Sequence, residues 1–355
     1  MSIKNLRDKI DETDSNIVKL LAERIRIAEE IGKEKEKRGK QIEDVEREKI
    51  VLEKVKNIAQ REQINQDGIE GIYRQIIAIS KNMQGIVVAF QGEIGAYSEE
   101  AAFRFFGSSV KVKPCEVLDD VFNTVEKTDT EFGIIPIENS LEGSISRSYD
   151  LLLDSNLKVC GEMELRINHC LIANPRVQLD AVKKIYSHPQ ALGQCKTFLK
   201  HLNCELIPTY DTAGSVKLVK EKHITNGGAV ASARAAEIYD MKILASEIED
   251  NPNNFTRFFI LSKKDSPPSG NDKTSIVFSV KHKPGALYQF LNELAKRNIN
   301  LTKIESRPTR QKPWEYNFYL DFEGHREDKA SQEALRYLEE TSLFVKVLGS
   351  YPKAK

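Results

Sequence analysis

The first 84 residues contain no proline, and their apolar residues recur at helical spacing, which confines this part of the chain to helices. Between Ile3 and Ile31 the apolar residues return at three- and four-residue spacing and mark one stripe on a long helix. A second helix is predicted from about Asp44, and a third around residues 69–84. A helix of about 30 residues cannot cover its own stripe with two short partners, so we expect two copies of this segment to pair.

Some polar residues in this helical part are unusual for a solvated surface. Arg24 lies on the apolar stripe, midway between Ile17 and Ile31, where an unmatched cation would cost several kcal/mol. Lys35 follows three turns later on the same side of the helix. Solvated charge explains most lysines and glutamates here, but it explains Arg24 poorly. The pattern predicts a polar pocket for a small dianion inside a helical dimer. Its other candidate residues share one face of the second helix (Asp44, Arg47 and Glu48) and one face of the third (Ser80 and Gln84).

The run LRDKIDETDSNIVKLLAERIRIAEEIGKEK, followed by DVEREK, resembles the all-helical chorismate mutase family. The resemblance implies that the carboxylates of the substrate are bound by Arg24, Arg47 and Ser80, together with Arg7 of the partner subunit. It also implies contacts of Lys35 and Gln84 with the ether oxygen, and of Asp44 and Glu48 with the region of the ring hydroxyl. A pericyclic rearrangement suits such a site, because it needs a compact substrate conformer and positive charge near the breaking C–O bond, but no nucleophile.

From Gly85 onward, short β-branched runs alternate with helical segments, which is typical of an α/β domain. Residues 86–90 (IVVAF) read as a buried strand, and the glycine loop after it leads into a helix whose expected N-cap is Ser98. Such a loop offers free amide N–H groups and the positive end of a helix dipole to an anion. The loop is not GxGxxG, so a dinucleotide fold is not indicated. Glu138, Asn139 and Ser140 follow a second strand.

Two further junctions carry candidate site residues. In YSHPQALGQC, Ser187 and Gln190 fit a capping box, which explains them as well as a ligand site does, whereas Gln194 has no capping role. Thr256 and Arg257 lie where the polar run NPNN meets the apolar strand FFIL, although an ordinary turn before a core strand would look similar. With strand-to-helix entries at 211–219 and 226–240, these junctions predict two α/β lobes around one anion-binding cleft.

The blocks GAYSEEAA, PIENSLEGSI, HCLIA, YSHPQALGQC, DTAGS and NNFTRFFIL together resemble the prephenate dehydratase family. The resemblance implies a two-lobed fold like that of periplasmic binding proteins, with Thr256 assisting the loss of the ring hydroxyl. It further implies a site lined by Glu138, Asn139, Ser187 and Gln194 and supported by Arg257. Ala96 stands where many members have threonine, and relatives that act on arogenate share the QGxxGAYSE form. The choice between prephenate and arogenate therefore stays open.

The last part of the chain follows the linker SPPSGNDK and shows the strand and helix order βαββαβ, a ferredoxin-like α+β pattern. It has no catalytic cluster, which favours a sensor. GALYQFL and KIESRP resemble the phenylalanine-binding form of the ACT domain, and this implies an effector site made of Gly285, Ala286, Leu287, Glu305, Ser306 and Arg307. The alternatives are a helix-start glycine at Gly285 and a surface ion pair of Glu305 with Arg307.

Composition limits the remaining functions. The 53 basic and 53 acidic residues balance, so net charge does not suggest nucleic-acid binding. No apolar run is long enough to span a bilayer, and the N-terminus lacks a signal-peptide core. The five cysteines never form CxxC, which favours free thiols in a reducing cytoplasm. The six histidines show no metal-binding spacing, so we expect no metal and no cofactor.

We therefore expect a chorismate mutase domain at 1–84, a prephenate dehydratase domain at 85–265 and an ACT regulatory domain at 274–355. The resemblances imply a bifunctional enzyme that converts chorismate to prephenate and prephenate to phenylpyruvate, with feedback by L-phenylalanine, as a homodimer or higher even oligomer. Two alternatives remain at this point. One is an arogenate dehydratase, and the other is a two-lobed ligand-binding module with a sensor domain and no catalysis.

Overall fold

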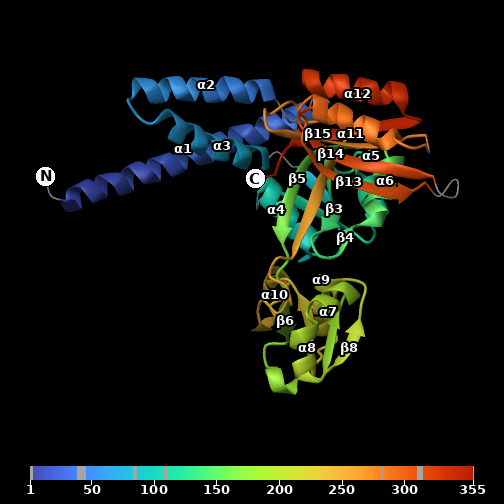
Figure 1. The fold of residues 1–355 in the computed structure, drawn as a ribbon. Coiled ribbons are helices and arrows are strands. Elements are labelled where there is room, and N and C mark those ends of the chain that lie inside the picture. Colours follow the sequence, from blue (N-terminus) through green and yellow to red (C-terminus); the bar gives the residue numbers. More distant parts are fainter. Residues whose placement is uncertain are drawn as a thin grey trace. The chain divides into compact units, whose positions relative to one another are not determined.

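The structure is a computed structural model that describes residues 3–37, 45–82, 86–107, 110–281, 283–309 and 315–354 (Figure 1). The chain divides into two compact units. The smaller unit runs to Val87 and also holds Ala102–Lys111, and the larger unit holds Val88–Ala101 and all residues from Val112 onward.

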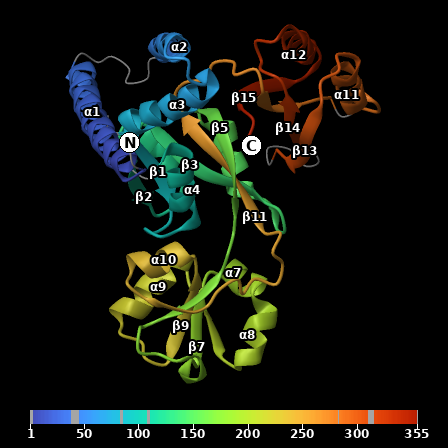
Figure 2. The ribbon, with the colours of Figure 1, turned by 90° about the vertical axis from the view of Figure 1, so that its left-hand side faces the viewer.

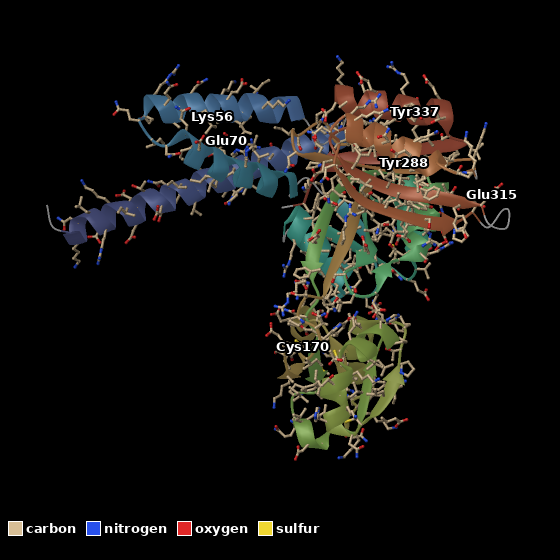
Figure 3. The ribbon with its side chains drawn as sticks, viewed as in Figure 1. Lys56, Glu70, Cys170, Tyr288, Glu315 and Tyr337 are labelled. Atoms are coloured by element: carbon tan, nitrogen blue, oxygen red, sulfur yellow. The ribbon has the colours of Figure 1, made fainter. Side chains whose placement is uncertain are left out.

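The smaller unit is helical, as the sequence predicts, with α1 (Ile3–Lys37), α2 (Val45–Arg61) and α3 (Gln66–Asn82). Val55 and Ala59 of α2 and Ile77 of α3 are buried, and Lys56 and Glu70 form an ion pair between the same two helices (Figure 3). The apolar stripe of α1 stays uncovered, because Leu6 is 48% exposed and Ile17 and Ile31 are 49% exposed. The two short helices thus leave the stripe available for another surface.

The first lobe of the larger unit is built on a mixed sheet in the order β2-β1-β3-β11-β5, with β4 paired to β3. Strand β11 (Phe255–Ser262) lies antiparallel to β3 (Phe132–Asn139) on one side and to β5 (Lys158–Arg166) on the other. The remaining elements of this lobe are β1 (Val87–Gln91), α4 (Tyr97–Phe106), β2 (Lys111–Cys115), α5 (Leu118–Glu126), β4 (Gly143–Ser144) and α6 (Ser146–Asp154).

The second lobe has its own sheet, in the order β10-β6-β9-β7-β8. The chain passes into this lobe after β5 and returns to the first lobe just before β11 (Figure 2). Its elements are β6 (Cys170–Ala173), η1 (Leu179–Ala181), β7 (Lys184–Ser187), α7 (Pro189–Gln194), α8 (Lys196–Leu202), β8 (Glu205–Pro208), α9 (Thr212–Glu221), β9 (Gly227–Ala231), α10 (Ala233–Ile238) and β10 (Lys242–Ala245). The larger unit therefore contains two α/β lobes joined by two crossings.

The C-terminal elements form a third sheet in the order β13-β14-β12-β15, and its pairings are antiparallel. They are β12 (Asp272–Ser279), α11 (Ala286–Lys296), β13 (Leu301–Pro308), β14 (Tyr316–Glu323), α12 (Lys329–Thr341) and β15 (Phe344–Pro352), in the order that the sequence predicts. Both helices pack on one face, where Phe278, Phe290 and Leu338 are buried. The opposite face shares a core with the first lobe, in which Tyr319 and Tyr351 of this sheet meet Phe259. No pattern in the sequence predicted this second packed face.

Two predicted helix caps are wrong. Helix α4 already begins at Tyr97, so Ser98 lies inside the helix and not at its N-cap. At α7 the N-cap is His188, whose Nδ1 accepts a hydrogen bond from the backbone N–H of Gln190 at 3.3 Å. Ser187 precedes this N-cap by one residue, and its Oγ donates to the carbonyl of Val230 at 2.6 Å. Asp211, at the strand-to-helix entry predicted for 211–219, caps α9 by accepting from the N–H of Gly214 at 2.6 Å.

Candidate active site

Thr256 and Asn139 are direct cross-strand partners at the ends of β11 and β3. The side-chain amide of Asn139 is fixed by its oxygen, since Oδ1 accepts from the backbone N–H groups of Leu141 at 3.0 Å and Glu142 at 3.1 Å. Its Nδ2 then faces Thr256 and lies 3.1 Å from Oγ1. The loop after β3 thus orients an amide donor toward the threonine hydroxyl.

Because the Thr256 hydroxyl oxygen accepts this hydrogen bond, its own proton can be donated to a ligand. Oγ1 accepts from Asn139, and in the described part of the chain no group accepts the Thr256 proton in return. The residue is only 8% exposed, so its hydroxyl is largely shielded from solvent. A buried hydroxyl that is held as an acceptor on one side is a ready donor to a ligand on the other.

A chain of hydrogen bonds continues from this pair into the second lobe. Asn139 Nδ2 also donates to Oδ1 of Asn254 at 2.7 Å, and Nδ2 of Asn254 donates to Oε1 of Gln194 at 2.8 Å. The same oxygen of Gln194 lies 3.0 Å from Nε2 of His169. The group therefore joins side chains from both lobes, and Asn254 at its centre is fully buried.

His169 ends this chain as a neutral imidazole. Burial lowers its pKa, although the contact with Gln194 opposes the shift. Because the Gln194 oxygen can only accept, Nε2 carries the proton and Nδ1 is the acceptor. The hydroxyl of Tyr97 lies 2.9 Å from Nδ1 and 2.6 Å from the carbonyl of Asn168, so its proton is placed between two acceptors. Tyr97 also packs edge-on against the imidazole.

The group around Thr256 contains three predicted residues and three that sequence reasoning missed. Asn139, Gln194 and Thr256 were predicted, whereas Tyr97, His169 and Asn254 were not. Each missed residue stands inside a block that carried the family resemblance, namely GAYSEEAA, HCLIA and NNFTRFFIL. Polar residues in such blocks that are not needed for capping would have been the signal.

Three predicted residues lie outside this group. Successive residues of a strand face opposite sides of the sheet, so Glu138 and Arg257, which pair with each other across β3 and β11, face away from Asn139 and Thr256. The Glu138 carboxylate lies 2.7 Å from Nζ of Lys303. Ser187 is engaged by the Val230 carbonyl. The prediction that Glu138 and Ser187 line the site next to Thr256 does not agree with their placement, whereas Arg257 was predicted only to support the site.

Arg257 is held on the opposite face of β11 by the third sheet. Its guanidinium lies 2.6 Å from the carboxylates of Glu162 and Asp321, and it donates to the hydroxyl of Tyr351 at 3.1 Å. Burial on its own would lower the pKa of Arg257, but the two carboxylates outweigh it and raise the pKa. Arg257 supports the strand that carries Thr256 and does not reach the Thr256 group itself.

The glycine loop that was expected to bind an anion is occupied by a carboxylate of the protein. The N–H of Gly95 donates to Oε2 of Glu99 at 2.9 Å, and the same oxygen pairs with Nε of Arg234 at 2.9 Å. Glu99 is 2% exposed. In this structure the loop therefore joins α4 to α10, and it does not present its Gly95 amide to a ligand.

The candidates of the helical unit are only partly described. Arg7 and Arg47 are exposed on α1 and α2, and Arg24 is partly buried on α1. Lys35, Glu48 and Ser80 belong to α1, α2 and α3, but their side chains lie outside what the structure describes, as do Asp44 and Gln84 altogether. This site stays a prediction.

The effector candidates divide between two places. Ala286 and Leu287 line a pocket of about 190 Å³ at the start of α11, together with residues from the ends of β12 and β14. Gly285 precedes them with a φ of 80°, which favours glycine. The side chains of Glu305 and Arg307 instead face the first lobe, and Ser306 is exposed on the other side of β13. The pocket is therefore lined by Ala286 and Leu287 of the predicted set, which follow Gly285, whereas Glu305, Ser306 and Arg307 lie elsewhere.

Among the described residues, no group of histidine, cysteine and carboxylate side chains could hold a metal ion. In the same part of the chain, no helix has the length and apolarity that crossing a bilayer requires.

Family models match three consecutive parts of the chain. The model of chorismate mutase type II matches residues 6–85, that of prephenate dehydratase matches residues 88–266, and that of the ACT domain matches residues 274–340.

Individual relatives agree with this division. A bifunctional chorismate mutase/prephenate dehydratase of Aquifex aeolicus is 41% identical over 99% of this chain and 98% of its own length. An arogenate dehydratase/prephenate dehydratase of Arabidopsis thaliana is 44% identical over 78% of this chain and 76% of its own length. Among solved structures, a prephenate dehydratase of Arthrobacter aurescens in complex with L-Phe is 30% identical, with a TM-score of 0.70 over 76% of this chain and 90% of that one.

Proposed function

The chain belongs to the bifunctional chorismate mutase/prephenate dehydratase family, and from this premise we propose how its residues divide the two reactions. It rearranges chorismate to prephenate and converts prephenate to phenylpyruvate by loss of water and carbon dioxide, in phenylalanine biosynthesis. The proposed domains are 1–84 for the mutase, 85–265 for the dehydratase, with a two-lobed fold like that of periplasmic binding proteins, and 274–355 for regulation.

For the dehydratase, Thr256 donates a hydrogen bond to the ring hydroxyl that leaves. As the ring carboxylate departs as carbon dioxide, its electron pair enters the ring and the C–O bond breaks. A donor at the oxygen stabilises the charge that develops there. The observation that carries this role is the fixed amide of Asn139, which makes Thr256 Oγ1 an acceptor and directs its proton elsewhere. Thr256 is no acid at neutral pH, so it orients or relays a proton.

The other members of the hydrogen-bonded group keep this pair in place. Gln194 and Asn254 link Asn139 to the second lobe, and a neutral His169 fixes the orientation of Gln194. Glu138, Ser187 and Arg257 act through the strands and loops that they hold. No cofactor or metal takes part in this proposal.

For the mutase, positive and polar side chains hold the dianion in its reactive conformer: Arg24, Arg47, Ser80, Lys35 and Gln84, with Asp44 and Glu48 at the ring hydroxyl and Arg7 of the partner subunit. The exposed apolar stripe of α1 supports pairing of two copies, because Ile17 and Ile31 need a cover that α2 and α3 do not supply. We therefore propose a homodimer or a higher even oligomer.

We also propose a reducing cytoplasm as the location of the protein, which agrees with the five free thiols of the chain.

For regulation, L-phenylalanine binds at the pocket beside Ala286 and Leu287. The volume of about 190 Å³ suits a single amino acid with an aromatic side chain, and a relative that is 30% identical was solved in complex with L-Phe. Gly285 supplies a backbone turn at the pocket. Glu305 and Arg307 on β13 respond to the effector through the face of the sheet that contacts the first lobe, and Ser306 lies on the exposed side of the same strand.

Arogenate is the second candidate substrate of the dehydratase. A plant relative that is 44% identical is named an arogenate dehydratase/prephenate dehydratase. Ala96, which stands where many family members have threonine, is buried in the loop before α4. Offering prephenate and arogenate side by side, with kcat/KM for each, decides between them.

The main experiment incubates the purified chain with chorismate and follows prephenate and phenylpyruvate, with and without L-phenylalanine. Both products should appear in sequence, and L-phenylalanine should change the rate of the second step. A chain that binds prephenate without forming phenylpyruvate would be the non-catalytic ligand-binding module, and the proposal would be wrong.

A further inference from the structure

Lys303 of β13 lies in a small cluster of charged and hydroxyl groups between the third sheet and the first lobe. Its Nζ is 2.7 Å from Oε2 of Glu138, 3.0 Å from Oγ of Ser144 and 3.5 Å from Oε2 of Glu305. Glu305 also accepts a hydrogen bond from the Ser144 hydroxyl. We call Glu138, Ser144, Lys303 and Glu305 the Lys303 cluster.

The Lys303 cluster is partly shielded from water. The side chain of Lys303 is 12% exposed, and Nζ lies 5.5 Å from the ring centre of Tyr149, which is buried. Glu138 is 34% and Glu305 is 24% exposed. Lys303 therefore lies between two carboxylates that would otherwise repel each other, and Glu305 has a second cation in Arg307, whose Nη1 is 3.7 Å from Oε1.

The cluster acts on the strand end that carries Asn139. Glu138 and Ser144 are cross-strand partners in the hairpin of β3 and β4, and the next pair is Asn139 with Gly143. The loop between them supplies the N–H groups of Leu141 and Glu142 that fix the Asn139 amide. By binding both arms of this hairpin, Lys303 holds the geometry from which Asn139 reaches Thr256.

Further along β13, Arg307 anchors the same strand to helix α6. Its Nη1 lies 2.9 Å from Oγ of Ser146, and Nη2 lies 3.2 Å from Oδ1 of Asp150. The strand that was predicted to carry effector residues is thus attached to the hairpin by Lys303 and Glu305 and to α6 by Arg307.

We propose that Lys303 of the regulatory sheet is a positioning residue for the dehydratase reaction and couples that reaction to the effector. It holds Glu138 and Ser144, and through the hairpin it sets the position of Asn139 against Thr256. A change at β13 that draws Glu305 away from Lys303 alters this hold. The inference rests on the proposed dehydratase site and on the proposed response to L-phenylalanine.

The test compares Lys303→Met and Lys303→Arg in the full-length chain, with prephenate as substrate. Lys303→Met should lower kcat on the order of tenfold or more with a much smaller change in KM, because misplacing a catalytic group mainly affects the transition state. The ratio of rates with and without L-phenylalanine, expected within the roughly 5–150-fold range of such couplings, should fall toward one. Lys303→Arg keeps the positive charge and should restore most of both.

Lys346→Met is the matched control. Lys346 also extends from the third sheet to the first lobe, where its Nζ donates to the carbonyl of Leu152 at 3.0 Å, that of Leu153 at 2.7 Å and that of Ser155 at 2.5 Å. Its loss removes a positive charge and a docking contact of the sheet without touching the hairpin of β3 and β4. Its kcat should therefore stay within about twofold of the wild-type value, while thermal unfolding reports folding of the larger unit in each variant.

Three results would overturn the proposal. The first is a Lys303→Met chain with wild-type kcat and wild-type response to L-phenylalanine. The second is an equal loss in Lys346→Met, which would assign the effect to docking of the sheet in general. The third is failure of Lys303→Arg to restore the rate. If Lys303→Met lacks a cooperative unfolding transition of the larger unit, Lys303→Gln, which can still bond to Ser144, replaces it under the same criteria. A wild-type chain without dehydratase turnover would refute the proposed function instead, so the two failures are distinguishable.

Discussion

Replacing Thr256 by valine tests the dehydratase mechanism at its central atom. Valine keeps the branched shape of threonine at a position that is 8% exposed, so packing against neighbouring side chains is retained. Only the hydroxyl is lost. Asn139 Nδ2 then loses its contact to Oγ1 but keeps Oδ1 of Asn254 at 2.7 Å and the carbonyl of Phe255 at 3.1 Å. Both of its hydrogens still have an acceptor.

These contacts separate the expected effect on stability from that on rate. Losing one hydrogen bond without leaving a buried donor unpaired costs about 0.5–1.5 kcal/mol of unfolding free energy. Losing a donor that assists the departing hydroxide should lower kcat by about 10²–10⁴, which corresponds to about 3–5 kcal/mol in the activation free energy. The rate should therefore fall far more than the stability.

The assay follows phenylpyruvate formation from prephenate, with mutase turnover and thermal unfolding measured on the same preparation. Thr256→Ser keeps the hydroxyl and is the matched control; it should retain most of the rate. If Thr256→Val forms phenylpyruvate at the wild-type rate, the hydroxyl takes no part in the reaction and the reasoning from the Asn139 amide is refuted.

Other perturbations test the remaining sites. Arg24→Ala should abolish mutase turnover while dehydratase turnover continues, and loss of both activities in a chorismate and a prephenate assay would contradict the assignment. Leu287→Glu should remove the response to L-phenylalanine, measured as the ratio of dehydratase rates with and without it, because a carboxylate enters an apolar wall of the pocket. Arg257→Gln should lower the unfolding free energy by about 3–5 kcal/mol, since Glu162 loses a buried partner, and an unchanged unfolding temperature would argue against this pair. Burial by itself would raise the pKa of Glu162, but Arg257 and Lys273 outweigh it and lower the pKa. The stabilisation by ionised Glu162 is therefore present above the ordinary glutamate pKa of about 4.3 and is lost as the pH falls below it. A wild-type unfolding temperature that does not drop with acid over this range would refute the shift.

Periodicity predicted the fold well because it is a local property. The helices of the first unit and the βαββαβ order of the C-terminal sheet follow from spacings of a few residues. Capping was less predictable, because several hydroxyls near a helix start compete for the same role. Ser187 fits the capping box by spacing, yet α7 begins at Pro189 with His188 as its N-cap, and the Ser187 hydroxyl donates to the carbonyl of Val230, distant in sequence. Only the tertiary structure decides such a competition.

The candidate site was predictable in part, because some of its residues stand at junctions that are visible in the local sequence. Asn139, Gln194 and Thr256 stand at junctions of polar and apolar segments, which a sequence shows directly. His169 and Tyr97 form a contact across 72 positions, and no local spacing reveals it. A role for their polar groups can be assigned only in the folded chain, where Gln194 of the second lobe contacts His169.

Alternation along a strand could be predicted, but not what covers each face. The sequence already requires Thr256 and Arg257 to point to opposite sides of one strand. It does not show that the third sheet packs on the Arg257 side, where Asp321 and Tyr351 receive the guanidinium. For this reason Arg257 and Glu138 were expected beside Thr256, although their side chains belong to the contact between the first lobe and the regulatory sheet.

The same alternation gives regulation a short path to the chemistry. On β11, Thr256 faces the hydrogen-bonded group while its neighbour Arg257 is bound to Asp321 of β14. On β3, Asn139 faces Thr256 while its neighbour Glu138 is bound to Lys303 of β13. A displacement of the regulatory sheet would therefore act on two adjacent strand ends, and each is one residue away from Asn139 or Thr256, the pair that we propose for the dehydratase reaction. We therefore expect such a displacement to reach Asn139 and Thr256 through their neighbours Glu138 and Arg257.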